Sequence, residues 1–180
     1  MNINSFFGYG GSMPTTPRDT VDRITSQWSA VRPDVDNSPI EVIGRVSRLS
    51  RLIDQHLAEN FARYDLEDWM YDVLATLRRS GEPYRLTAGD LMRQSMVTTG
   101  AMTNRIDRLE QRGLVERAAT DDRRKVIVRL TKRGLDTVDE VVVEHMGTER
   151  EILSSLSSRQ QHELAKLLRI TLIALGDVSE

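Results

Sequence analysis

The stretch RGLVERAATDDRRKVIVRLTKRG, residues 112–134, constrains the fold more than any other part of the chain. Two short runs, Leu114–Ala118 and Val126–Leu130, are rich in Val, Ile and Leu, as β-strands are. Two acids followed at once by three cations occupy residues 121–125, at the tip between the runs. The pattern predicts a β-hairpin with a charged tip.

The residues before the hairpin predict a helix-turn-helix. Thr87 and Asp90 form a capping pattern that begins a short helix, which ends near Ser95. After a turn at residues 96–97, a second helix begins at residue 98 or 99 and stops before Gly113. Two helices joined by so short a turn match the helix-turn-helix plan.

The second helix has two unlike faces. Met102, Ile106 and Leu109 recur at helical spacing and are expected to form a buried stripe. The other face carries small, polar and basic residues: Gly100, Ala101, Thr103, Asn104, Asp107 and Arg108. A helix with such an outer face is suited to the major groove of DNA.

Charge is unevenly distributed along the chain. Residues 78–133 contain 12 Arg and 2 Lys against 7 acidic residues, a net charge of +7, so the remainder must carry −9 to give the total of −2. A cationic middle between acidic ends indicates a surface for a polyanion, although a charge run is often only a solvated face.

The hairpin tip gains a role if the second helix lies in the major groove. The hairpin could then reach along the phosphates to the adjacent minor groove, whose negative potential attracts cations. We expect one acid of the tip to pair with Arg123 or Arg124, while the other Arg reaches outward. A solvated hairpin with neutralised charges is the alternative.

About 50 residues resemble the winged helix-turn-helix of the MarR family of bacterial transcriptional regulators. The resemblance is carried by Leu86-Thr87, Asn104-Arg105-Ile106-Asp107-Arg108-Leu109, Gly113-Leu114-Val115, Asp122-Arg123-Arg124, and Leu130-Thr131 with Gly134. It implies a mainly α fold with a small β-wing, and a homodimer on a pseudo-palindromic operator with half-sites roughly 10 bp apart, or a multiple of that. The expected DNA-binding residues are Ser95, Thr98, Thr99, Thr103, Asn104, Arg105, Arg108, Arg123 and Arg124.

We expect four segments. Residues 1–18, rich in Gly, Ser, Thr and Pro, are predicted to be a mobile leader. Residues 19–64 and 134–180 are expected to form N- and C-terminal dimerisation helices, and residues 65–133 the winged helix-turn-helix region. Ser38 and Glu41 predict a capping box at the start of a long helix. Apolar residues at helical spacing in the flanking helices are expected to be buried, among them Val42, Val46, Leu49, Val142 and Met146.

Four further residues bear on a ligand. Taken singly, Asp72 and Arg79 are expected to be solvated, Trp28 to anchor a core or a dimer, and Arg117 to serve the wing. Together they resemble the urate-responsive branch of the MarR family. That resemblance implies that Trp28 and Arg79 hold a planar anion, such as a urate-like purine or an organic carboxylate. The anion would displace Asp72, and Arg117 and Arg105 would pass the shift to the recognition helix.

Several classes of function lack support in the sequence. The absence of Cys excludes disulfides and thiolate nucleophiles. No P-loop, G-x-S-x-G or HExxH motif occurs, so we expect neither an enzyme nor a cofactor. No apolar run approaches the length of a membrane span, and we expect a cytoplasmic protein.

Alternatives remain open at this point. His145 and Glu149 stand at i and i+4, with His162-Glu163 further on, which would suit a metal-responsive regulator, but exposed polar residues are the simpler interpretation and no metal site is assigned. A MarR-type regulator without the anion site is a second alternative. A helical dimerisation module that does not bind DNA is a third.

Overall fold

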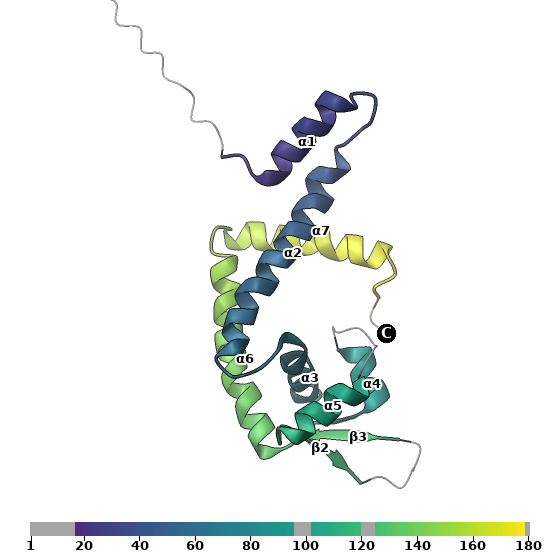
Figure 1. Cartoon of the computed structure of the whole chain (residues 1–180), viewed down its shortest axis with the longest axis vertical. Helices are drawn as coiled ribbons and strands as arrows, with labels where there is room; N and C mark the ends of the chain where they lie inside the picture. The colour runs from purple at the N-terminus through teal and green to yellow at the C-terminus, as the bar shows by residue number, and fades with distance from the viewer. Residues whose placement is uncertain (1–16, 96–101, 120–124, 179–180) are drawn as a thin grey trace, which may run out of the picture. The chain divides into compact units, whose positions relative to one another are not determined.

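The computed structural model describes residues 17–95, 102–119 and 125–178. They form two compact units that divide after Arg51, within helix α2 (Figure 1). The predicted leader, apart from its last two residues, lies outside the described residues. No helix in the described part of the chain is long and apolar enough to cross a membrane.

The first unit is a helical hairpin made of α1 (Thr20–Val31) and the first half of α2 (Pro39–Ala62). Asp19 begins α1 with a capping box, because its carboxylate accepts the N–H groups of Val21 and Asp22 while Asp22 accepts that of Asp19. Arg45 of α2 then bonds both carboxylates, Asp19 at 2.8 Å and Asp22 at 2.7 Å. Val21 is buried against Gly44, whose missing side chain lets the two helices approach.

The start of α2 differs from its prediction. The backbone N–H of Ser38 donates to Asp36 at 2.9 Å rather than to Glu41. Asp36 lies two residues earlier and its short side chain folds back on the chain as an Asx turn, which satisfies this N–H before the helix begins. The capping box predicted at Ser38 was therefore wrong, although the helix begins where it was expected.

The second unit contains the rest of α2, then α3 (Asp68–Arg79), β1 (Arg85–Thr87), α4 (Ala88–Gln94), α5 (Met102–Gln111), β2 (Val115–Ala118), β3 (Ile127–Leu130), α6 (Lys132–Ile152) and α7 (Ser158–Ala174). The three strands form one antiparallel sheet in the order β1-β3-β2. β2 and β3 are the predicted hairpin, with Val115 opposite Leu130. The mainly α fold with a small β-wing is confirmed.

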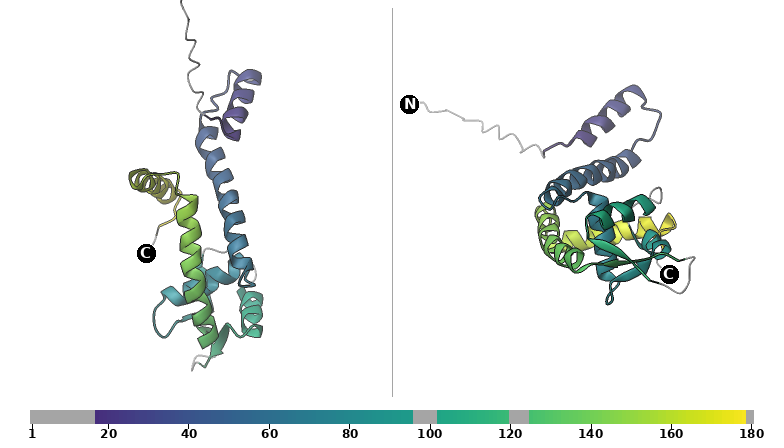
Figure 2. Two further views of the ribbon diagram at one scale, coloured as in Figure 1. Left: turned by 90° about the vertical axis from the view of Figure 1, so that its left-hand side faces the viewer. Right: turned by 60° about the horizontal axis from the view of Figure 1, so that its bottom comes forward.

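The core of the second unit joins the helices to the sheet. α3 packs against α4, α6 and β3, and α5 packs against β2, as the views of Figures 1 and 2 allow the reader to follow. Val73, Leu74 and Leu77 of α3 are fully buried at this junction. Because α3 touches both the wing and the helix-turn-helix, it is the scaffold on which the outer face of α5 is presented.

Several apolar residues predicted to be buried are exposed in the single chain. Val42, Val46 and Leu49 of α2 are 64%, 44% and 41% exposed. On α6, Met146 is exposed and Val142 half-buried, because the buried stripe runs through Val138, Val141 and His145 instead. A second apolar stripe on the same helix misled the periodicity argument, which identifies apolar faces but not what covers them.

Candidate nucleic-acid interface

The two faces of α5 lie as the sequence predicted. Met102, Ile106 and Leu109 are buried, and Thr103 and Asn104 are exposed. Gly113 ends the helix with a φ of +68°, a left-handed conformation that glycine adopts without steric cost. The outer face of α5 therefore presents polar groups on a helix that the core holds in place.

Side-chain hydrogen bonds fix both ends of α4. The Thr87 hydroxyl accepts the Asp90 N–H at 3.0 Å, which confirms the predicted cap. Ser95, the C-cap residue, is half-buried and donates its hydroxyl to the Leu91 carbonyl at 2.7 Å. The predicted DNA-binding residues Thr98, Thr99, Arg123 and Arg124 lie outside the described residues.

Arg117 connects the hairpin of β2 and β3 to α5. Its guanidinium, on β2, forms ion pairs with Asp107 and Glu110 of α5, and its backbone N–H donates to Glu110 at 3.1 Å. The hydrogen bond to Asp107 is the main cause that raises the pKa of Arg117. Arg117 thus fixes the angle between β2 and α5, because one planar guanidinium is held by two carboxylates.

Arg105 and Arg108 of α5 lie over Trp69 of α3. The guanidinium carbon of Arg108 is 4.9 Å from the ring centroid and that of Arg105 is 5.5 Å from it. Arg108 also pairs with Glu67, whose pKa is lowered first by the hydrogen bond from Trp69 and then by Arg108. Trp69 and Glu67 were not predicted as site residues, since nothing in their local spacing places them beside α5.

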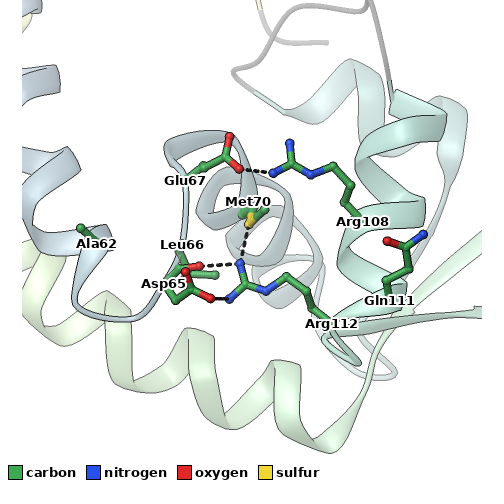
Figure 3. Close-up of a pocket in the computed structure, with 8 residues that line it drawn as sticks. All are labelled: Ala62, Asp65, Leu66, Glu67, Met70, Arg108, Gln111 and Arg112. Atoms are coloured by element: carbon green, nitrogen blue, oxygen red, sulfur yellow. Dashed lines mark hydrogen bonds and ion pairs between the residues drawn. The ribbon is translucent and has the colours of Figure 1, made fainter.

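A pocket of about 500 Å³ separates this corner of α3 from α5 (Figure 3). Arg108 and Arg112 extend from α5 toward Glu67 and Asp65 on the opposite wall, and Met70 lies between the two pairs. Asp65 has a φ of 54°, the left-handed region that aspartate tolerates better than most residues, and its backbone carbonyl accepts Arg112 as well. α3 begins three residues later, at Asp68.

The four ligand-site candidates fall on different elements. Asp72 is half-buried on α3, and Arg79 is exposed at the end of that helix, where it donates to the Gln94 carbonyl of α4. Trp28 belongs to the first unit and lines a pocket of about 230 Å³ with Pro39 and Ile40. Arg117 is the residue that links the wing to α5.

His145 is buried in the core. Its ring lies against Phe61 and Tyr71, with centroids 5.6 Å and 4.6 Å away, and its Nε2 is 3.3 Å from Glu149. Burial raises the pKa of Tyr71 to about 12. Within residues 17–95, 102–119 and 125–178, no group of three or more His, Asp or Glu side chains could hold a metal ion.

Known proteins share both the sequence and the fold. Residues 64–125 match the MarR family. The chain is 42% identical over 149 residues to the HTH-type transcriptional regulator PecS of Dickeya dadantii (strain 3937), an alignment that covers 82% of this chain and 90% of PecS.

Two solved structures show the same fold. A mutant MarR from E. coli complexed with operator DNA has a TM-score of 0.65 and 24% identity, over 81% of this chain and 97% of that one. BpsR of Bordetella bronchiseptica, whose DNA binding is regulated by 6-hydroxynicotinic acid, has a TM-score of 0.65 and 23% identity, over 73% of this chain and 98% of that one. The expectation of a regulator rather than an enzyme agrees with these relatives. The chain belongs to the MarR family of DNA-binding transcriptional regulators.

Proposed function

We propose that the protein is a homodimeric repressor that binds a pseudo-palindromic operator in the cytoplasm and is released by a small organic anion. The observation that carries the DNA-reading part is the orientation of α5. Its apolar stripe is buried, Thr103 and Asn104 are exposed, and Arg117 fixes it to the wing. Such a helix can enter the major groove while the wing reaches the neighbouring minor groove.

Exposed apolar side chains support the dimer. They lie on the flanking helices predicted to pair two chains, and a single chain leaves them uncovered: Val42, Ile43, Val46, Leu49 and Leu52 on α2, and Leu167, Leu168, Ile170, Leu172 and Ile173 on α7. α7 has no buried residue of its own. Apolar stripes of this size mark association surfaces in soluble proteins, and a two-fold dimer would supply the two half-site contacts.

For the ligand we favour a planar organic anion such as urate, held by Trp28 and Arg79. An indole face stacks on a flat ligand, and a guanidinium matches a delocalised anion. Asp72 lies seven residues before Arg79 on α3, about two helical turns or roughly 10 Å away, so an anion near Arg79 would repel it. The solved relative regulated by 6-hydroxynicotinic acid, another flat anion-forming molecule, is consistent with this ligand class.

Arg79 and Arg117 offer a route from the ligand to the DNA. Arg79 holds the Gln94 carbonyl, one residue before Ser95 caps α4, so an anion that draws Arg79 away would loosen the end of α4. Arg117 would transmit the shift because it binds Asp107 and Glu110 on that helix. The ligand releases DNA only by as much as it favours the DNA-incompetent state.

Gel-shift titration on the DNA upstream of the protein's own gene tests the DNA-binding part. We expect a specific complex that Asn104→Ala weakens roughly 5- to 150-fold, the range for loss of a base contact. Arg150→Ala, an exposed substitution on α6, is the control. A chain that stays monomeric, or that binds no duplex at low salt, contradicts the proposal.

The ligand is tested by adding urate, xanthine, citrate or aconitate to the preformed complex. We expect one of these anions to release the DNA, and Asp72→Asn and Arg79→Ala to abolish the response while the complex still forms. Arg150→Ala is again the control and is expected to respond fully. An unchanged response in both site variants would remove the anion site and leave a MarR-type regulator without it.

A further inference from the structure

Glu67 and Trp69, at the start of α3, both face the recognition helix. Trp69 is half-buried and packs on the core, and its indole N–H donates to the Glu67 carboxylate at 2.8 Å. Glu67 holds the N-cap position of α3, yet its side chain makes no capping hydrogen bond. A polar side chain at that position ordinarily satisfies the free N–H groups of the first turn. The carboxylate is directed at Arg108 instead.

Trp69 orients two arginines of α5. Arg105 and Arg108 stand three residues apart, so they project from the same side of the helix and can share one ring. Their distances to the ring centroid, 5.5 Å and 4.9 Å, fall within the about 6 Å over which an aromatic face attracts a cation. The ring restricts the two guanidinium groups and does not itself neutralise their charge.

Arg108 and Arg112 differ in their partners: Arg108 pairs with Glu67, whereas Arg112 contacts Asp65 and Met70 (Figure 3). Arg112 bonds the carbonyl and the carboxylate of Asp65, the latter at 2.9 Å, and its side chain is 26% exposed. Arg108 is twice as exposed, at 52%, and pairs with the 53% exposed Glu67. An ion pair in that much water adds little to stability. Asp65 is itself 96% exposed, so the firmer hold on Arg112 comes from its own burial and from its second acceptor, the Asp65 carbonyl. Arg112 therefore anchors the end of α5, whereas Arg108 can change partners.

A DNA phosphate can take the place of Glu67. Carboxylate and phosphate both accept hydrogen bonds from a guanidinium, and the phosphate of a duplex also releases condensed counterions when it is neutralised. A phosphate is thus the stronger partner for Arg108 once the outer face of α5 has docked.

We propose that Glu67 is an internal substitute for a DNA phosphate, and that Trp69 is the platform on which Arg108 exchanges one for the other. In the free protein Glu67 holds Arg108 on the ring, and on DNA the guanidinium turns to a phosphate while it stays on Trp69. Every duplex must displace the carboxylate, and base contacts from α5 offset that cost only on the operator. Glu67 therefore limits non-cognate occupancy, and the inference rests on the proposed role of α5.

The first test is Glu67→Gln, which removes the competing charge but keeps an oxygen for the Trp69 N–H. We expect affinity for operator and for non-cognate duplex to rise about 2- to 5-fold, as the loss of one exposed ion pair allows. Glu59→Gln, an exposed carboxylate on α2, makes the same change in net charge and is expected to alter neither affinity. Unchanged binding by Glu67→Gln overturns the proposal.

The second test separates the platform from simple packing. Trp69→Phe keeps a ring face and is expected to retain most operator affinity, whereas Trp69→Leu is expected to lose about 2- to 10-fold. The loss should shrink in an Arg108→Ala background, because the platform then has one guanidinium fewer to hold. Melting temperatures of the same samples report packing. An equal loss with and without Arg108 overturns the platform.

The DNA-binding role of α5 and the exchange at Glu67 can fail separately. If Asn104→Ala and Arg108→Ala leave operator affinity unchanged, α5 is not the recognition helix and the proposed function fails together with this inference. If both weaken binding while Glu67→Gln changes nothing, only the exchange at Glu67 is overturned.

Discussion

Gly134, in the first turn of α6, has no room for a side chain. A Cβ there would lie 1.9 Å from the carbonyl oxygen of Leu114 and 2.9 Å from its carbonyl carbon. Ordinary contact begins at 3.4 Å, so the backbone at Leu114 and the first turn of α6 would have to separate by the difference, about 1.5 Å. The same carbonyl accepts the N–H of Thr131, the N-cap residue of α6, at 3.2 Å. The clash therefore falls on the junction that fixes the wing to α6.

We expect Gly134→Ala to lower the free energy of unfolding by about 2 to 4 kcal/mol. Overpacking against backbone costs about 1 to 3 kcal/mol, and displacement of the Leu114 carbonyl weakens a hydrogen bond worth about 1 kcal/mol. The better helix propensity of Ala returns less than about 1 kcal/mol. A rotamer change cannot relieve a clash with a backbone atom, so the overpacking cost is expected toward the upper part of its range of about 1 to 3 kcal/mol.

Urea unfolding followed by circular dichroism measures the effect. Parent and variant must be compared at equal protein concentration, because the proposed dimer would couple stability to concentration. Gly147→Ala is the matched control on the same helix: a Cβ there meets nothing within 4 Å, and we expect a gain of about 0.5 to 1 kcal/mol. A Gly134→Ala protein as stable as its parent, with an unchanged m value, would refute the steric argument.

Three further predictions concern the wing and the core. Arg117→Ala should weaken operator binding about 5- to 150-fold in an anisotropy assay, because it frees the wing and leaves Asp107 and Glu110 unneutralised near DNA. Arg129→Ala, on β3, should weaken operator binding less. Equal losses of affinity in the two variants would contradict the linking role of Arg117. The pKa of Tyr71 is about 12 in the folded protein against 10 in the unfolded chain, so the unfolded state loses the phenol proton first. The contribution of Tyr71 to stability is therefore complete below pH 10 and is lost as the pH rises to about 12. Tyr71→Phe should flatten that decline of stability in alkaline urea titrations, and an equally steep decline would contradict the prediction. Replacement by Ala of whichever of Arg123 and Arg124 reaches the groove should cost about 1 to 3 kcal/mol of operator binding. Replacement of an Arg that touches only phosphate should cost less binding free energy, and equally on all DNA sequences. If neither variant changes the affinity or its salt dependence, the wing does not bind DNA.

Local signals predicted most of the fold. Thr87 begins α4 as expected. Gly113 ends α5. These signals succeed because each is a hydrogen bond or a dihedral angle set within a few residues, where the sequence contains the whole interaction.

Burial of the flanking helices could not be predicted in the same way. The spacing of Val42, Val46 and Leu49 shows that α2 has an apolar face, and the structure leaves this face exposed in one chain. Hydrophobic periodicity reports a preference for leaving water, and a core and a second subunit satisfy that preference equally. What covers the face is a property of the assembly.

The candidate site was predicted where one helix contains it and missed where it crosses elements. Asn104 could be placed on the outer face of α5 from the period of that helix alone. Trp69 looked like one more apolar position of α3, and its contact with Arg108, 39 residues later, depends on how α3 and α5 pack. A single sequence contains no direct measure of such a pair.

The net charge of residues 78–133 shows the same limit in electrostatics. The count of +7 treats every cation as available to DNA, but some are neutralised by acids from outside the stretch, as Arg78 is by Asp139 of α6 and Arg108 by Glu67 before α3. The attraction of the folded protein for DNA is therefore weaker than the count suggests, and it depends on which internal pairs can open. Exposed pairs open at little cost whereas shielded ones do not. The exposure of the pair between Arg108 and Glu67 thus matters more for DNA binding than the total charge.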